Sequence, residues 1–216
     1  MEFRHKSVLL HETIENLNIK PDGIYVDGTL GGGGHSFQIL KQLDVGGRLI
    51  GIDQDEDALR AAGERLAIFG EKVTMVRSNY CHMKRVLSEL GIEKVSGIVL
   101  DLGVSSYQLD EPERGFTYKA EGPLDLRLNP EKGESGADRL SSMDYEEIVG
   151  MLVENSDEPY AEKIAEEIMK QKRSGGIRMT TELRDAVERA LKFLPAKEQK
   201  EAVKKSCART FQALRI

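Results

Sequence analysis

A run of glycines between an apolar segment and a helical pattern is the strongest chemical signal in this 216-residue chain. It reads Val26-Asp27-Gly28-Thr29-Leu30-Gly31-Gly32-Gly33-Gly34-His35. Glycines such as Gly31, Gly33 and Gly34 let the backbone approach a ligand closely, and the start of a helix offers unpaired amide donors. No frame of the run fits the dinucleotide pattern G-x-G-x-x-G. A flexible linker is the alternative, and the flanking apolar and helical segments argue against it.

Two carboxylates flank this loop and limit what it could bind. Asp27 ends the segment before the glycines, where it would repel a pyrophosphate but suit the ammonium group of an amino acid. Asp53 ends the next apolar segment, about twenty residues past the glycines, where a carboxylate can accept hydrogen bonds from both hydroxyls of an adenosine ribose. A ligand with a ribose and a cationic amino acid, but no phosphate, is S-adenosylmethionine. Tyr80 is placed to pack on its adenine. The alternative for Asp53 is a structural role at the start of the following turn.

A third carboxylate, Asp101, follows the fourth apolar segment, at the edge where open α/β sheets build their sites. Methyl transfer from a sulfonium is an in-line displacement with a neutral leaving group, so it needs an aligned nucleophile and a place for a proton. An amino group conjugated into a base ring is a poor nucleophile, and Asp101 is the candidate acceptor for its N–H. Capping of the following turn is the structural alternative. No Pro-Cys pair lies here, which argues against cysteine chemistry on ring carbons.

Short apolar segments alternating with helical patterns must position these residues. Strands are expected at 23–27, 48–53, 73–76 and 96–101, with helices at 35–43, 56–66 and 82–90 between them. This alternation predicts a parallel, doubly wound α/β sheet. After a loop-like stretch at 107–129, helices are expected at 145–153, 159–172, 180–193 and 196–205, with Thr181 as a cap of the third. A four-stranded parallel sheet would have an open apolar edge, so we expect further chain or a partner to cover it.

The composition predicts a soluble, cytoplasmic protein. Hydrophobic residues make up 39% and charged residues 31%, which allows a packed core without disulfides. The two cysteines, Cys81 and Cys207, show neither CxxC nor His/Cys ligand spacing, which argues against a disulfide framework and against a metal site. No apolar stretch has the length of a signal peptide or a membrane span. We therefore expect no metal and no membrane contact.

The net charge of -6 argues against a protein that clamps nucleic acid over its whole surface. Two local clusters could still contact RNA, and the alternative for both is a solvated helix end. They are Lys170, Lys172, Arg173 and Arg178, and Lys204, Lys205 and Arg209.

Long segments of the chain resemble the MraW/RsmH family of methyltransferases. The matching segments are His5–Leu10, Asp27–His35, Leu100–Asp110, Glu113–Phe116, Gly122–Arg127 and Arg209–Ile216, in this order. The resemblance implies a bacterial enzyme that uses S-adenosylmethionine to methylate the exocyclic N4 of a cytidine in small-subunit (16S) ribosomal RNA. It also implies a Rossmann-like methyltransferase sheet with an inserted all-helical subdomain for substrate recognition.

The resemblance carries roles onto individual residues. The family's cofactor contacts fall on Gly33, Gly34, His35, Asp53, Tyr80, Asp101 and Gln108, and Tyr80 replaces the usual phenylalanine. Two segments depart from the family pattern: Asn155–Tyr160 replaces a Gly-Glu-Glu-Arg-Phe-like run, and Lys205-Ser206-Cys207 replaces a His-Pro-Ala-like one. Both lie in the helical part, so they bear on substrate contacts rather than on cofactor binding. Family members continue past Ile216 into further strands, so the C-terminal strands are expected to be missing from this sequence.

Three regions with different roles are expected. Residues 1–108 form the cofactor-binding domain, 109–206 the loop and helical insert, and 207–216 the start of the return to the first domain. The loop at 107–118 should border the target pocket, with Phe116 and Tyr118 either stacking on the base or filling the core, and Lys170, Lys172 and Arg173 holding phosphates. The alternatives are a methyltransferase for another RNA or a protein, and a non-catalytic, cofactor-binding RNA module. The oligomeric state stays open, a homodimer included.

Overall fold

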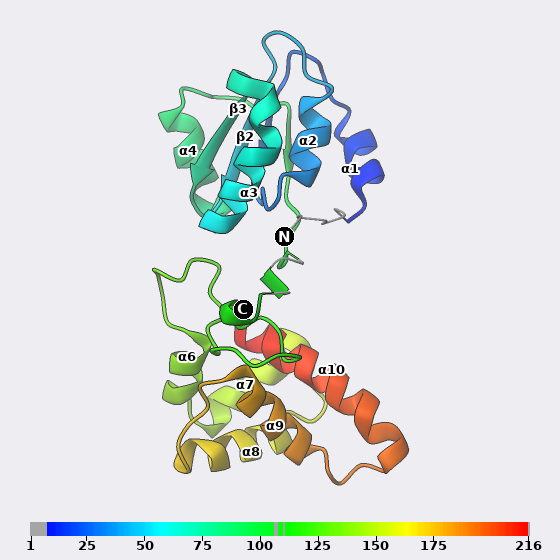
Figure 1. Cartoon of the computed structure of the whole chain (residues 1–216), viewed down its shortest axis with the longest axis vertical. Helices are drawn as coiled ribbons and strands as arrows, with labels where there is room; N and C mark the ends of the chain where they lie inside the picture. The colour runs from blue at the N-terminus through cyan, green and yellow to red at the C-terminus, as the bar shows by residue number, and fades with distance from the viewer. Residues whose placement is uncertain (1–7, 106–107, 110, 216) are drawn as a thin grey trace. The chain divides into compact units, whose positions relative to one another are not determined.

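The computed structural model describes residues 8–105, 108–109 and 111–215. Its chain forms two compact units, Met1–Ser105 and Ser106–Ile216, which are described separately. The first unit contains a β-sheet with helices on both faces, and the second is built from helices and loops (Figure 1). Among the described residues, no helix is both long enough and apolar enough to span a membrane.

The first unit is a Rossmann-like α/β fold around a parallel four-stranded sheet. Its strands are β1 (Ile24–Asp27), β2 (Arg48–Asp53), β3 (Val73–Arg77) and β4 (Gly97–Val99). The spatial order is β3-β2-β1-β4, and every neighbouring pair is parallel. The chain therefore moves outward from β1 to β3 and then returns to the other side of β1. This reversal makes the gap between β1 and β4 the switch point, where open α/β sheets place their ligands.

Helices cover both faces of this sheet. They are α1 (Leu10–Leu17), α2 (Gly34–Leu40), α3 (Glu56–Leu66) and α4 (Met83–Glu89), with short 3-10 turns at Ala67–Lys72 and Tyr80–His82. Alternate strand residues face opposite sides. Tyr25 and Leu49 pack with α2 and α3 on one face, whereas Val26 and Ile50 pack with α4 on the other. The two apolar layers fix the ends of the strands, and therefore the polar residues that follow them.

The second unit begins with a short 3-10 turn at Pro112–Arg114 and continues as a set of packed helices. These are α6 (Gly136–Ser142), α7 (Tyr145–Ser156), α8 (Ala161–Arg173), α9 (Thr180–Ala190) and α10 (Ala196–Arg215). Ser135 and Asp144 start α6 and α7 with capping boxes, in which the cap side chain and the third helical residue exchange hydrogen bonds with backbone amides.

The start of α9 differs from the sequence prediction. Thr181 is not its cap, because the helix begins at Thr180 and its N-cap residue is Met179. The Glu182 carboxylate accepts the Met179 N–H at 3.0 Å and so provides a partner for the backbone donor at the N-cap. The neighbouring hydroxyl of Thr180 donates to the carbonyl of Ala120 at 2.7 Å and ties α9 to the preceding loop.

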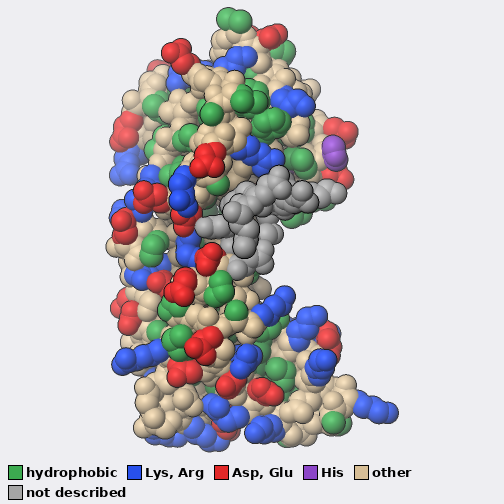
Figure 2. Space-filling view, viewed as in Figure 1, with side chains coloured by type: hydrophobic (Ala, Val, Ile, Leu, Met, Phe, Trp, Pro, Cys, Tyr) green, Lys and Arg blue, Asp and Glu red, His purple; other side chains and the backbone are tan. Residues whose placement is uncertain are grey.

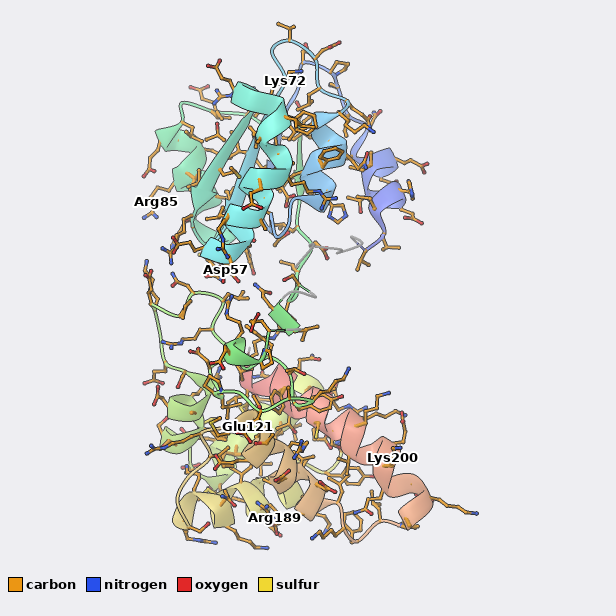
Figure 3. The ribbon with its side chains drawn as sticks, in the orientation of Figure 1. Asp57, Lys72, Arg85, Glu121, Arg189 and Lys200 are labelled. Carbon is orange, nitrogen blue, oxygen red and sulfur yellow. The ribbon has the colours of Figure 1, made fainter. Side chains whose placement is uncertain are left out.

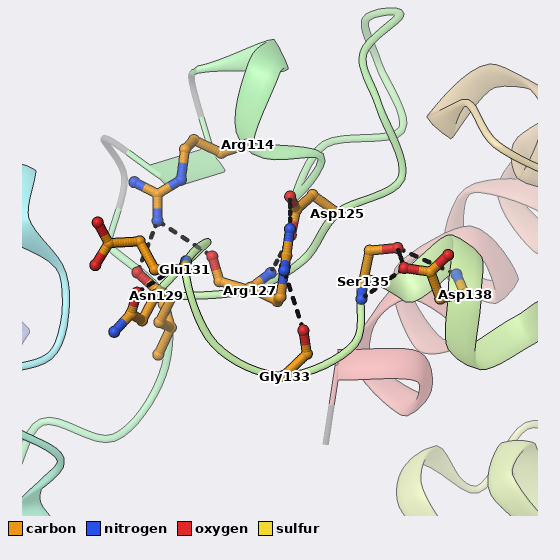
Figure 4. A network of polar contacts seen from close by, with 9 residues as sticks. Arg114, Asp125, Arg127, Asn129, Glu131, Gly133, Ser135 and Asp138 are labelled. Atoms are coloured by element: carbon orange, nitrogen blue, oxygen red, sulfur yellow. Dashed lines mark hydrogen bonds and ion pairs between the residues drawn. The ribbon is translucent and has the colours of Figure 1, made fainter.

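Two arginines organise the loop that precedes α6 (Figure 4). Arg127 forms a two-pronged contact with the Asp125 carboxylate, at 2.6 and 2.8 Å, and also donates to the Gly133 carbonyl at 3.0 Å. Arg114 donates to the Arg127 and Leu128 carbonyls at 3.2 and 3.0 Å. The Arg127 guanidinium holds the pKa of Asp125 below its ordinary value. Both guanidinium groups are therefore used to fold this loop.

Candidate functional site

Polar residues gather at the carboxyl ends of the four strands in the first unit. Figure 3 shows Asp57, at the start of α3, at the end of the unit where the strands finish, and Lys72 at the opposite end. β1 ends at Asp27 and β2 at Asp53, and Asp101 comes two residues after the end of β4. The sheet order brings the ends of β1 and β4 together at the switch point.

Asp27 is buried at this edge, with 2% of its surface exposed. Its carboxylate accepts hydrogen bonds from the Ser36 hydroxyl at 2.7 Å and from the Thr29 N–H at 3.2 Å. Burial raises the pKa of Asp27 above its ordinary value, and these two hydrogen bonds oppose that rise. A cationic group arriving near this carboxylate would also favour its ionised form.

Asp53 holds the glycine loop to the end of β2. One carboxylate oxygen accepts the Gly31 N–H at 2.8 Å, and the other accepts the Asp55 N–H at 3.0 Å. Burial is the main cause that raises the pKa of Asp53. The backbone amide of Gln54 also acts on this carboxylate. Each carboxylate oxygen offers about two acceptor positions, so the group retains some capacity for a further donor.

The glycine loop needs its glycines at two positions for different reasons. Gly33 is the N-cap of α2 and has a φ of +71°, in the left-handed region that glycine occupies without strain. Gly28 is closely surrounded, because a Cβ there would lie 2.5 Å from Cδ2 of Leu100 and 3.0 Å from Cε of Met83, so these side chains would have to move. The loop therefore follows a path that brings its backbone close to β4 and α4. Gly34 is the first residue of α2.

Asp101 is joined to the glycine loop across the switch point. Its backbone N–H donates to the Thr29 hydroxyl oxygen at 2.7 Å. Its carboxylate lies 4.0 Å from Nδ1 of His35, and 40% of the side chain is exposed. Nε2 of the buried His35 lies 3.2 Å from the carbonyl of Val8. The structure thus brings together Asp27, His35 and Asp101, three residues that the sequence placed in one site.

Tyr80 and Gln108 differ in their relation to this edge. Tyr80 opens the 3-10 turn after β3, where Asn79 caps the turn by accepting the Cys81 N–H at 2.9 Å. Its side chain is 43% exposed, and its Cβ would lie 3.3 Å from a Cβ at Gly28. Gln108 belongs to the second unit and is buried there. Cofactor contacts by Tyr80 and Gln108 stay predictions.

The predicted RNA contacts in the second unit are only partly available. Phe116 is 5% exposed, so filling the core is the correct alternative for this ring. Tyr118 packs edge-to-face on Phe211, with ring centroids 5.8 Å apart. Lys170 pairs with Glu167 at 2.6 Å, and the Lys172 ammonium donates to the Met143 carbonyl. The sequence has no acid between Lys170 and Arg173, but Glu167 lies one turn earlier on α8 and pairs with Lys170.

Two site residues escaped the sequence analysis. Ser36 and Thr29 hold the Asp27 carboxylate, and Thr29 also holds Asp101. Both stand in or beside the glycine run, and this position is the signal that could have identified them. No group of three or more metal-binding side chains occurs in the part of the chain that the structure describes.

Comparison with known proteins identifies the family. The model of the MraW methylase family matches residues 2–216. Ribosomal RNA small subunit methyltransferase H of Lachnospira eligens is 51% identical over 216 residues, which is 100% of this chain and 67% of that protein. Ribosomal RNA small subunit methyltransferase H 2 of Agathobacter rectalis is 52% identical over 217 residues, 100% of this chain and 68% of that protein. The chain spans about two thirds of the length of these curated relatives. It belongs to the MraW methylase family.

Proposed function

We propose that this protein transfers a methyl group from S-adenosylmethionine to the exocyclic N4 of a cytidine in small-subunit (16S) ribosomal RNA. The observation that carries the proposal is the link between the glycine loop and Asp101 across the switch point, 2.7 Å from the Thr29 oxygen to the Asp101 amide. In the proposal, Asp101 is the proton acceptor, and this contact supports a position beside a loop suited to a ribose and an amino acid. Relatives about 50% identical are named for methylation of small-subunit ribosomal RNA.

The residues at this edge fit such a cofactor. The Asp53 carboxylate is fixed by backbone amides and retains acceptor capacity for a ribose hydroxyl. Asp27 offers a buried carboxylate to an ammonium group, whose positive charge would offset the cost of burying it. Backbone without side chains at Gly31, Gly33 and Gly34 allows close approach. The exposed ring of Tyr80 can pack on adenine.

Asp101 would act on the methyl acceptor. The cofactor, when bound, supplies an electrophilic methyl group on a sulfonium. The cytosine amine is a weak nucleophile because its lone pair is delocalised into the ring, so a carboxylate that accepts its N–H raises its reactivity. Thr29 fixes the backbone of Asp101, and His35 lies beside its carboxylate. Alignment of the amine for in-line attack is the other requirement.

The two units would divide the work. Residues 1–108 bind the cofactor, and the helical part within 109–206 recognises RNA, with 207–216 as the start of the return to the first domain. The proposed location of the protein is the cytoplasm, where small-subunit ribosomal RNA is made and modified. The proposed partner is that RNA, either alone or within the small subunit.

Mass spectrometry of nucleosides from 16S ribosomal RNA tests the proposal. Cells with the intact gene should contain N4-methylated cytidine that cells without the gene lack, and re-introduction of the gene should restore it. An Asp101→Asn gene is the matched control, because its product should fold and yet restore less of the nucleoside than the wild-type gene. The same nucleoside content with and without the gene would contradict the proposed substrate. A different methylated nucleoside would redirect the activity to another target.

A further inference from the structure

An exposed aromatic cluster lies in the second unit, where α8 begins and where α9 gives way to α10. Phe193, in the turn after α9, leaves 54% of its surface exposed. Tyr160 meets its ring edge-to-face, with centroids 5.9 Å apart and ring planes at 72°. Nζ of Lys163 lies 4.8 Å from the Phe193 ring centroid. A single exposed ring would need no explanation, but an aromatic pair with a cation on it is a known form of ligand surface.

The chain around Phe193 is strongly basic although the whole chain is acidic. Residues 189–209 contain seven basic and two acidic side chains, a local net charge of +5 in a chain of net charge -6. The basic residues are Arg189, Lys192, Lys197, Lys200, Lys204, Lys205 and Arg209. Figure 2 shows Lys and Arg side chains along the visible face of α10, and Figure 3 shows Lys200 on that helix.

Some of these charges already have partners. Arg189 contacts Glu167 at 3.3 Å, and Lys205 pairs with Glu201 at 3.6 Å. Arg209 lies 4.0 Å from Glu158. They are therefore less free to bind an external anion.

Four exposed lysines on or near the turn of Phe193 are not paired with an acid of the described ranges, and neither is Lys204, which lies further along α10. Within the described residues, Lys163, Lys192, Lys197 and Lys200 form no ion pair. Two lie beside Phe193, one in contact with its ring and one next to it in sequence, and the other two follow on the first turns of α10. Glu162, Glu198 and Glu201 are the neighbouring acids in sequence, and Glu201 already pairs with Lys205, so the lysines remain in excess.

We propose that Tyr160, Lys163 and Phe193 form a stacking platform for a base of single-stranded RNA. Lys192, Lys197 and Lys200 then contact the phosphates on either side of that base. This inference rests on the proposed function and names the RNA-binding face of the helical unit. It replaces the cluster at Lys170 and Lys172, whose ammonium groups are engaged within the protein.

The chemistry of the surface favours RNA over an acidic peptide. Lysines alone would serve either partner, because both carry negative charge. A base, however, has a flat face that stacks on an aromatic ring, and aromatic platforms flanked by basic residues are the common way to bind single strands. An acidic peptide gains nothing from the ring, so dependence on Phe193 separates the two partners.

Fluorescence anisotropy with a labelled single-stranded RNA of mixed sequence, about 12 nucleotides long, tests the platform. Phe193→Ala should weaken binding at least about fivefold, the lower end of what one base–aromatic stack contributes. Phe193→Trp should retain the affinity, and Phe193→Leu, which keeps an apolar side chain of similar bulk, should lose it. Circular dichroism confirms that each variant is folded, as expected for a change at an exposed turn.

The lysines are tested by salt dependence. Changing Lys192, Lys197 and Lys200 together to Gln should lower the slope of log affinity against log salt by about 0.7 for each phosphate contact removed. Changing Lys170, Lys172 and Arg173 together to Gln is the matched control and should leave the slope as it is. A polyglutamate competitor should displace RNA poorly compared with unlabelled RNA.

Four results would overturn the platform: absence of RNA binding by the wild type, wild-type affinity in both Phe193→Ala and Phe193→Leu, equal competition by polyglutamate, or a slope that changes only in the control variant. Methyl transfer to ribosomal RNA is measured on the same samples. Transfer by a wild type whose RNA affinity is indifferent to Phe193 removes the platform and leaves the proposed function. RNA binding that depends on Phe193, without methyl transfer, would support the platform and contradict the proposed function.

Discussion

The hydroxyl oxygen of Thr29 accepts the backbone N–H of Asp101 at 2.7 Å, although 72 residues separate the two in sequence. Thr29 also donates its own N–H to the buried Asp27 carboxylate. One residue thus connects the proposed ammonium-binding carboxylate to the proposed proton acceptor. The position of Asp101 depends on the glycine loop, because the residue lies beyond the end of β4 and outside the ladder of the sheet.

Thr29→Val should make the backbone of Asp101 more mobile and should leave cofactor binding intact. The change keeps the shape of the side chain and removes the acceptor, so the Asp101 amide should exchange with solvent roughly threefold to tenfold faster, as expected for loss of one hydrogen bond. Thr29→Ser retains the oxygen and should behave as the wild type. Hydrogen exchange followed by NMR measures this in the free protein. Equal protection in all three proteins would mean that Thr29 does not hold Asp101.

Asp53→Ala should weaken S-adenosylmethionine binding by about 1.5–3 kcal/mol, the usual range for hydrogen bonds to a charged group. Asp57→Ala changes a carboxylate in the first turn of α3 that pairs with Arg60, and it should leave affinity unaffected. Isothermal titration calorimetry compares the two variants, and NAD serves as a ligand that should not bind. Unchanged affinity in Asp53→Ala would remove this residue from the site.

Asp101→Asn should reduce turnover more than cofactor affinity, because an amide is a weaker acceptor for the N–H of the target amine. The measurement is the rate of methyl transfer at saturating S-adenosylmethionine, together with cofactor affinity by calorimetry. An intact rate combined with weaker cofactor binding would make Asp101 a binding residue only.

Asp27 should make the folded state less stable as the pH rises. Burial raises its pKa above the ordinary value of 3.8, so the folded protein keeps a proton that the unfolded chain has already released. The free energy of unfolding should therefore fall as the pH rises from 3.8 through the folded pKa, by about 1.4 kcal/mol for each unit of the rise. Asp27→Asn should remove this fall, and the exposed Asp22→Asn should not. Urea unfolding across this pH range measures it, and equal profiles for the wild type and Asp27→Asn would contradict the prediction.

Ser206→Ala should destabilise the helical unit. The Ser206 hydroxyl donates to Oε1 of the buried Glu158 at 2.9 Å, and Oε2 of Glu158 has no hydrogen-bond partner among the described residues. Loss of this donor should lower the free energy of unfolding by about 1.5–3 kcal/mol. Ser174→Ala, at an exposed helix end, should change it by less than about 0.5 kcal/mol. Denaturant unfolding compares the two, and equal stabilities would contradict the prediction.

The sequence predicted the sheet well because its central strands are continuous apolar runs. β2 spans 48–53 as expected, and α3 spans 56–66. The edge strand was less predictable: β4 ends at Val99 rather than residue 101, since Asp101 gives its amide to Thr29. α1 and α6 were missed because each is short. α1 nevertheless has Leu10, Ile14 and Leu17 at helical spacing, which is the signal that could have identified it.

The last helix and the site show what sequence patterns omit. α10 runs to Arg215, beyond the expected end at 205, because Cys207, Phe211 and Leu214 continue its buried face. The carboxylates and glycines were identified from their positions after strands. The hydrogen bonds of Ser36 and Thr29 depend on which loops meet in space, and no local pattern encodes that.

The contact between Glu158 and Ser206 also bears on which parts of this protein can be exchanged with those of a relative. The two residues belong to the two segments that depart from the family pattern, Asn155–Tyr160 and Lys205–Cys207, and they meet in the interior of the helical unit. A chain that carried the acid without the hydroxyl would bury a poorly satisfied charge. A chimera made with a relative should therefore transplant the segments around Glu158 and Ser206 together.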